Sequence, residues 1–131
     1  MKIWDILTIC TVKIVSVILK LLGKKAGNYP GIIALKMNKN ILKRLKINCP
    51  VIAVTGTNGK TTTNNFINFL FETDGKKVVS NKDGNNMTTG ILTTLIQNST
   101  LTGKVKADYL VFEVDEGYIP VIFKDLKLDT F

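Results

Sequence analysis

The chain has 131 residues, 45% of them hydrophobic, which is enough for the core of one small domain or of part of a larger one. Its formal net charge is +8, and the absence of histidine with only two cysteines excludes a zinc site built from Cys and His within these residues. Two isolated cysteines, Cys10 and Cys49, are typical of reduced thiols in a cytosolic protein.

The positive charge belongs to the first part of the chain. Residues 1–50 hold nine lysines, one arginine and one acid, whereas residues 51–131 hold eight lysines and nine acids. A basic segment ahead of a near-neutral domain suggests an anionic partner, such as lipid headgroups, nucleic acid or a phosphorylated substrate.

Residues 3–22 are mostly apolar but are interrupted by charges, so no run reaches the ~20 apolar residues of a membrane span. No small-x-small cleavage site follows them, which argues against a signal peptide. At about 100° per residue the polar side chains form one narrow stripe. The stripe comprises Lys2, Asp5, Lys13, Ser16, Lys20 and Lys24. We therefore predict an amphipathic helix that ends at Gly23 and either packs on its own protein, lies in a membrane interface or, as a third alternative, spans the membrane.

Two segments separate this helix from the rest of the chain. The pattern "NYPGI" at 28–32 predicts a turn, and "IIALKMNKNILKRLKI" predicts a second, basic and partly helical stretch that Pro50 ends. We place a boundary here, with an N-terminal helix and basic segment at residues 1–49 and a second domain at residues 50–131.

Strand and helix patterns alternate after Pro50. This order predicts an α/β fold with a parallel sheet, and the ends of its strands are where ligands bind. The helix at 61–73 is expected to have an apolar face of Phe66, Phe69 and Leu70, widened by Ile67 and Phe71. The predicted strands are 51–55, 76–81 and 108–114, and the predicted helices are 61–73, one around 91–96 and one around 120–126.

The segment "VIAVTGTNGKTTT", at 51–63, has the composition of a phosphate-binding loop between a strand and a helix. The generic signature G-x-x-x-x-G-K-[ST] requires glycine at position 54, where Val54 stands. We interpret Val54 as strand and the loop as a tighter one that starts at Gly56. Lys60 would then face the β- and γ-phosphates, and the Thr61 hydroxyl would face Mg²⁺. The alternative is a helix-capping turn rich in threonine and asparagine.

The stretch "TGTNGKTTT", at 55–63, resembles the ATP loop of the Mur ligase family, which also occurs in folylpolyglutamate and cyanophycin synthetases. Three further segments, "PGIIALK", "NKDGNNMTTGI" and "FEVDEGYIP", resemble one subgroup, the MurT-type subunit of lipid II isoglutaminyl synthase. The resemblance implies that residues 50–131 form an incomplete ATP-binding domain with part of the parallel P-loop sheet of the Mur ligase central domain, preceded here by the amphipathic helix.

The resemblance also implies an activity. An ATP-dependent amidotransferase subunit would activate the D-glutamate α-carboxylate of lipid II as an acyl phosphate, for amidation to D-isoglutamine in peptidoglycan synthesis. The ammonia would come from a glutaminase subunit of the GatD type. Glu113 and Thr61 would hold magnesium, and Asp115 and Glu116 would cap the next helix or support the metal or substrate. The implied ATP-binding residues are Gly56, Thr57, Asn58, Gly59, Lys60, Thr61, Thr62 and Asn86.

Members of this family continue beyond the segment seen here, with a zinc ribbon and a C-terminal domain. We therefore expect an N-terminal part of such an enzyme, which does not amidate alone and has zinc only in the downstream part. The expected location is the cytoplasm, with peripheral contact of residues 1–25 at the inner face of the plasma membrane as an option, and no nucleic acid as partner. The alternatives are another Mur-type amide ligase and a non-catalytic nucleotide-binding or membrane-associated module.

Overall fold

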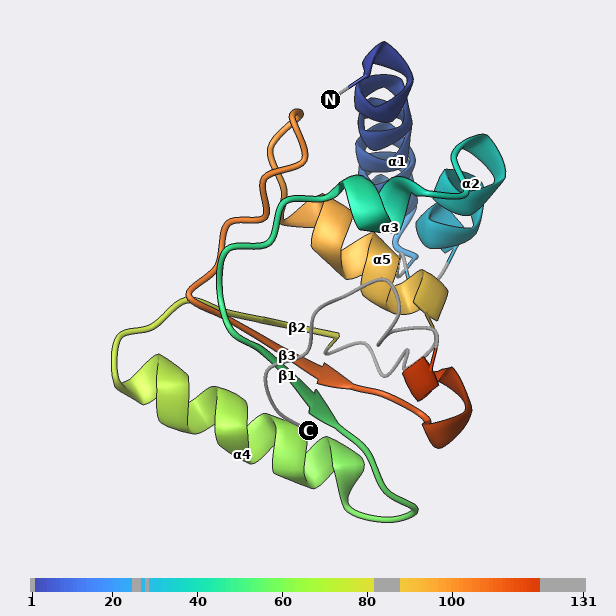
Figure 1. The fold of residues 1–131 in the computed structure, drawn as a ribbon. Coiled ribbons are helices and arrows are strands. Elements are labelled where there is room, and N and C mark those ends of the chain that lie inside the picture. Colours follow the sequence, from blue (N-terminus) through green and yellow to red (C-terminus); the bar gives the residue numbers. More distant parts are fainter. Residues whose placement is uncertain (1, 25–26, 28, 82–87, 121–131) are drawn as a thin grey trace.

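A computed structural model describes residues 2–24, 27, 29–81 and 88–120. Figure 1 shows its helices and strands in chain order. The α-helices are α1 (Ile3–Leu21), α2 (Tyr29–Met37), α3 (Ile41–Arg44), α4 (Lys60–Thr73) and α5 (Thr88–Gln97). The strands are β1 (Val51–Val54), β2 (Val78–Ser80) and β3 (Tyr109–Glu113), followed by a 3-10 helix, η1 (Glu116–Tyr118).

The three strands form a parallel sheet in the order β1-β3-β2, which confirms the predicted α/β class. The predicted strands are all present, each shortened at one or both ends. Strand β3 is central, so its last residue, Glu113, pairs with Val54 of β1. The predicted helix at 120–126 lies, after Pro120, outside the described residues.

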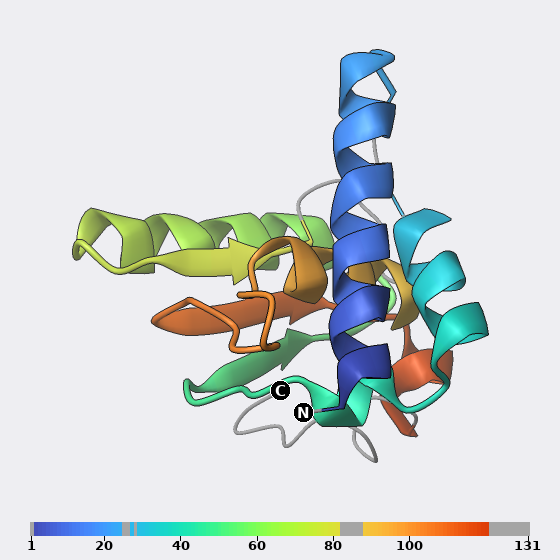
Figure 2. The ribbon, with the colours of Figure 1, turned by 90° about the horizontal axis from the view of Figure 1, so that it is seen from above.

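The sheet has helices on both faces. Helix α4 covers one face, and α5 covers the other with α1, α2 and α3 outside it (Figures 1 and 2). One hydrophobic core joins the outer helices to the sheet, since Ile9 of α1 and Ala34 of α2 belong to the same cluster as Leu92 of α5 and Leu110 of β3. The boundary between residues 49 and 50 stays a prediction, although side chains from both sides lie in this core.

The turn predicted at "NYPGI" is wrong, because α2 begins at Tyr29 and includes Pro30 and Gly31. Proline is tolerated in the first turn of a helix, where its missing N–H is not needed. Gly31 is where α2 touches α5: its backbone N–H donates to Thr93 Oγ1 at 2.8 Å, and a Cβ there would lie 1.9 Å from the Thr89 carbonyl oxygen. Pro30 therefore lies in the first turn of α2, and Gly31 allows α2 to approach α5 closely.

Helix α1 is confirmed, and Gly23, with φ 74°, follows its end as predicted. Two members of its polar stripe, Asp5 and Ser16, point inward, whereas Lys2, Lys20 and Lys24 are exposed. Asp5 is 3% exposed and accepts hydrogen bonds from the Lys2 backbone N–H and from Asn38 Nδ2. The helix packs on its own protein, through α2 and α5, and the residues buried on that side are polar and apolar: Asp5, Thr8, Ile9, Val12 and Ser16. Among the described residues, no helix has the length and apolarity needed to cross a membrane.

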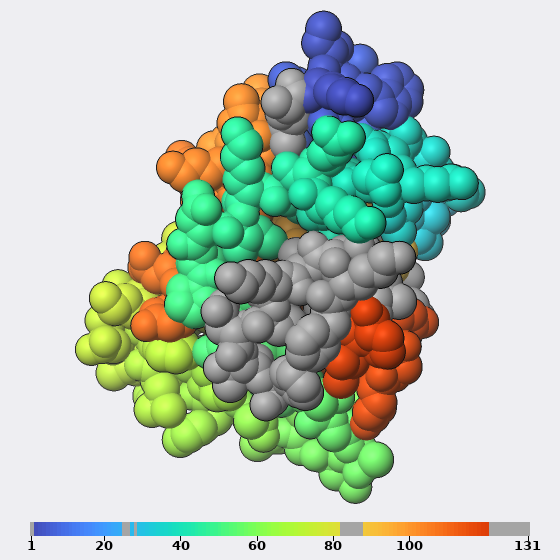
Figure 3. All heavy atoms as spheres, viewed as in Figure 1, coloured from blue at the N-terminus to red at the C-terminus, as the bar shows by residue number. Residues whose placement is uncertain are grey.

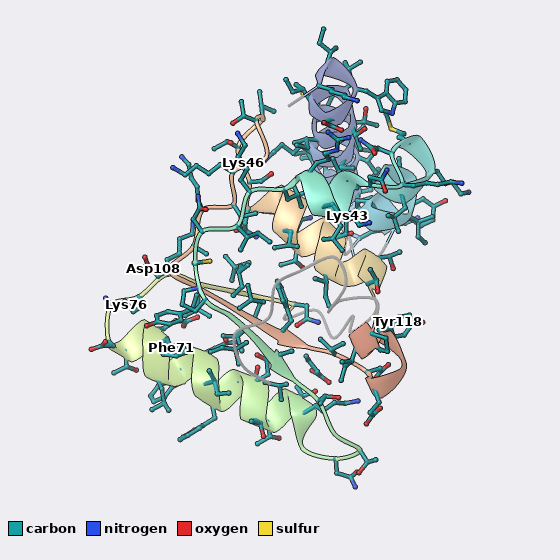
Figure 4. The ribbon with its side chains drawn as sticks, in the orientation of Figure 1. Lys43, Lys46, Phe71, Lys76, Asp108 and Tyr118 are labelled. Carbon is teal, nitrogen blue, oxygen red and sulfur yellow. The ribbon has the colours of Figure 1, made fainter. Side chains whose placement is uncertain are left out.

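Helix α4 likewise buries polar side chains and exposes large apolar ones. Its buried residues are Asn64 and Asn68, whereas Phe66 and Phe69 of the predicted apolar face are more than half exposed. The Asn68 carboxamide donates to Ser80 Oγ of β2 at 2.9 Å. Phe71, labelled in Figure 4, stacks on Tyr109 of β3 with ring centroids 4.0 Å apart. The helix is thus confirmed, but the centre of the predicted face is exposed, and of that face only the widening residues Ile67 and Phe71 are half-buried.

Candidate nucleotide site

The loop between β1 and α4 has the backbone that the glycines predict. Val54 is strand, as interpreted, and Gly56 and Gly59 have φ values of 144° and 80°, which side chains with a Cβ rarely adopt. Gly59 is the N-cap residue of α4. The loop therefore turns at two glycines directly before the helix begins.

The start of α4 is open to solvent around this loop. Thr57, Asn58 and Gly59 are exposed, as are Thr61 and Thr62 in the first turn. The first intrahelical bond runs from the Thr63 N–H to the Gly59 carbonyl, so the N–H groups ahead of it have no partner within the helix. Such groups, with the positive end of the helix dipole, favour phosphate.

Thr61 and Glu113 meet across two elements. The Thr61 hydroxyl donates to Glu113 Oε2 at 2.9 Å, and Glu113 is 8% exposed. The contact follows from the topology, because β3 lies beside β1 and ends level with it. A hydroxyl and a carboxylate are oxygen ligands of the kind Mg²⁺ takes, with water and phosphate completing its shell. The described residues contain no group of three or more His, Cys, Asp or Glu that could hold a metal by themselves.

Lys60 pairs with Asp115 just beyond the end of β3. Lys60 Nζ lies 2.7 Å from Asp115 Oδ1. This hydrogen bond is the main reason that the pKa of Lys60 is raised above its ordinary value, with added attraction from Glu116 and Glu113 and an opposing effect of burial. Asp115 occupies the N-cap position of η1, as expected for a cap residue, and Glu116 lies in its first turn, but the Asp115 carboxylate makes no capping hydrogen bond.

Asn81 follows the second strand at the edge of the sheet where ligands are expected, but the sequence assigned it no role at the site. Its carboxamide donates to the Glu113 carbonyl at 2.7 Å and accepts from the Glu113 N–H at 2.9 Å. The backbone pairing of β2 and β3 ends at Ser80 and Val111, so the Asn81 side chain extends that ladder to Glu113. The available signal was a carboxamide placed directly after a buried strand. Asn81 positions the backbone from which the Glu113 carboxylate projects.

The structure therefore brings together Lys60, Thr61, Glu113 and Asp115 at one edge of the sheet, with Asn81 behind them. The remaining predicted ligand, Asn86, lies outside the described residues. The geometry is that of a glycine-containing turn between a strand and a helix, with a carboxylate on the neighbouring strand, and a helix start of this kind is suited to bind an anion.

Comparison with known proteins identifies the family. The family model of the Mur ligase middle domain matches residues 54–120, so the chain belongs to the Mur ligase family. The matched segment runs from the end of β1, through the phosphate loop, to the residues after η1.

Curated relatives carry the name lipid II isoglutaminyl synthase (glutamine-hydrolyzing) subunit MurT. The chain is 36% identical over 105 residues to the one from Staphylococcus aureus (strain COL), which is 79% of this chain and 23% of that protein. It is 44% identical over 116 residues to the one from Streptococcus pneumoniae, which is 87% of this chain and 25% of that protein. The chain spans about a quarter of the length of these relatives.

Proposed function

We propose that this chain supplies the phosphate-binding part of an ATP-dependent ligase that forms amide bonds. The observation that carries the proposal is the contact between the Thr61 hydroxyl and the Glu113 carboxylate at the start of α4. It joins a hydroxyl from the loop's helix to an acid from the adjacent strand, which is the pair of oxygen ligands that a magnesium–nucleotide complex needs.

In this proposal the backbone of 56–62 surrounds the ATP phosphates, and Thr61 and Glu113 hold Mg²⁺, which neutralises phosphate charge when bound. Lys60 would exchange Asp115 for the β- and γ-phosphate oxygens, since its ammonium already lies at the mouth of the loop. Asn86 stays a proposed phosphate ligand. A lysine held by a carboxylate before the nucleotide arrives keeps its charge and its place without a phosphate.

The substrate and the partner are proposed from the relatives. Their name describes a subunit of a glutamine-hydrolyzing synthase that acts on lipid II. We therefore propose that the ligase amidates the D-glutamate α-carboxylate of lipid II, through an acyl phosphate, with ammonia from a GatD-type glutaminase subunit. Cytoplasmic location, zinc only in a downstream part and lack of amidation by the 131-residue chain alone belong to the same proposal.

Calorimetric titration of the chain with Mg·ATP tests the site. Lys60→Ala is expected to weaken binding by about ten- to a hundredfold, because a charge-assisted hydrogen bond to phosphate is lost. Lys76→Ala is the matched control: Lys76 is exposed and follows the other end of α4, as Figure 4 shows, so its variant should bind like the wild type.

Repeating the titration in EDTA separates the metal ligands from the phosphate ligand. Thr61→Val should weaken binding in magnesium and leave the weaker metal-free binding unchanged, because it removes one oxygen from the metal shell. Equal Mg·ATP affinities for the wild type and Lys60→Ala would show that the loop does not bind the nucleotide.

A further inference from the structure

Helix α1 presents an apolar face to solvent on the side opposite the buried Asp5 and Ser16. Figure 2 shows α1 on the outside of the molecule along its length, and Figure 3 shows it at one extremity. Leu21 is 81% exposed. Each member of this outer face of α1 is at least 47% exposed, and the members are Ile3, Trp4, Leu7, Ile14, Val17, Ile18, Leu21 and Leu22.

The charge around this face is of one sign. Asp5 is the sole acid of residues 1–50, and it is buried against Asn38. Lys2 precedes the outer face of α1, and Lys20 and Lys24 lie at its end, all three exposed. Further exposed cations of the same segment are Lys36, Lys39, Lys43, Arg44 and Lys46. In the described part of residues 1–50, the large side chains exposed to solvent are therefore apolar or positively charged, and neutral polar side chains lie between them.

Helix α4 offers an internal comparison, since Phe66 and Phe69 are exposed to a similar degree. The acids Glu72 and Asp74 follow them, and the cations Lys76 and Lys77 follow these acids, all four exposed. At the start of α4, Lys60 is paired with Asp115. Among the described residues, an exposed apolar face therefore occurs on both helices. The face on α4 is followed by charges of both signs, whereas the face on α1 is bordered by the exposed Lys2, Lys20 and Lys24 and by no exposed acid of residues 2–24.

We propose that the outer face of α1 docks on the surface of an anionic lipid bilayer. Aliphatic side chains and a tryptophan would enter the headgroup–acyl boundary, while the lysines at the helix ends reach the anionic headgroups along their own methylene stems. A second copy of the chain is disfavoured as the occupant, because it would bring two strongly basic segments together. The proposal is independent of the nucleotide site.

Vesicle co-sedimentation of the 131-residue chain tests the docking. Binding is expected with vesicles of phosphatidylcholine and phosphatidylglycerol, and it should fall at least about tenfold with phosphatidylcholine alone, because several lysines lose their headgroup attraction. The double variant Ile14→Asp and Leu21→Asp should abolish binding. The double variant Phe66→Asp and Phe69→Asp, with the same added charge on comparably exposed sites of α4, should bind like the wild type. Circular dichroism checks that all three proteins are folded.

A second variant keeps the test independent of the apolar substitutions. Lys20→Gln with Lys24→Gln should weaken binding to the anionic vesicles and leave the circular dichroism spectrum unchanged. Absence of vesicle binding by the wild type, or equal loss in the α1 and α4 variants, would overturn the proposal. A wild-type dimer that the α1 variant converts to monomer, without any lipid binding, would overturn it too and identify a second copy as the occupant.

Discussion

Helices α1 and α4 lie on opposite sides of the molecule and share an unusual orientation. Each turns polar side chains inward and leaves large apolar ones at the surface. They differ in how the inward groups are satisfied: Asp5 of α1 has two hydrogen-bond donors, whereas Asn68 of α4 donates to Ser80 and its Oδ1 has no partner among the described residues. Periodicity identifies a two-sided helix, but the side that faces inward depends on which partners the neighbouring elements supply.

A side chain at Gly31 should disrupt the packing of α2 and α1 on α5. Gly31→Ala places a methyl group 1.9 Å from the Thr89 carbonyl oxygen, so α2 must move away from α5 and α1 must move with it. We expect a loss of about 3 kcal/mol in the free energy of unfolding, measured by urea titration. Gly117→Ala is the control, because its added Cβ would meet nothing within 4 Å. Equal unfolding midpoints for the two variants would contradict the close contact.

The α/β class, the order of strands and helices along the chain and the glycine turn before α4 were predictable, because each depends on local composition. The β-branched run at 51–54 and the two glycines of the loop specify strand and turn without help from distant residues. The contact between Thr61 and Glu113 was predictable as well, since parallel strands end at one edge of the sheet.

The orientation of the helices and the start of α2 were not predictable in the same way. Burial of Asp5 depends on Asn38, 33 residues away, and the helical Pro30–Gly31 pair depends on Thr89 and Thr93 of α5. The Asn81 bonds to Glu113 likewise depend on the alignment of two strands. These are contacts between residues far apart in the chain, and no local pattern specifies them.

The buried Asp5 and Asn68 side chains differ in how many of their polar atoms are hydrogen-bonded. Removing them should therefore cost different amounts of unfolding free energy. Asp5→Ala leaves the Asn38 amide and the Lys2 N–H without their acceptor, so about 2 kcal/mol of unfolding free energy should be lost. Asn68→Ala removes one bond to Ser80 and an oxygen that has no described partner, so the loss should be about 1 kcal/mol. Urea unfolding of both variants measures the difference. An equal or reversed order would contradict it.

The Lys60–Asp115 pair at the start of α4 should give the smallest effect, a contribution to unfolding free energy that does not change with pH near neutrality. The hydrogen bond to Asp115 raises the pKa of Lys60 above 10.5, so the folded state favours the charged ammonium. A raised lysine pKa adds stability that is fully present below the unfolded value of about 10.4 and is lost as the pH rises through the folded value.

The difference in unfolding midpoint between the wild type and Lys60→Gln should therefore be constant from about pH 7 to pH 9, and it should shrink only above about pH 10.5. The same argument makes the Lys60 contribution to Mg·ATP affinity constant over that range, because the ammonium stays charged whether it faces Asp115 or phosphate. Lys76→Gln, at an exposed position beyond the other end of α4, is the control and should give a small difference at every pH. A difference that changes between pH 7 and pH 9 would show that another titrating group, and not the Lys60–Asp115 pair, determines the charge at the mouth of the loop.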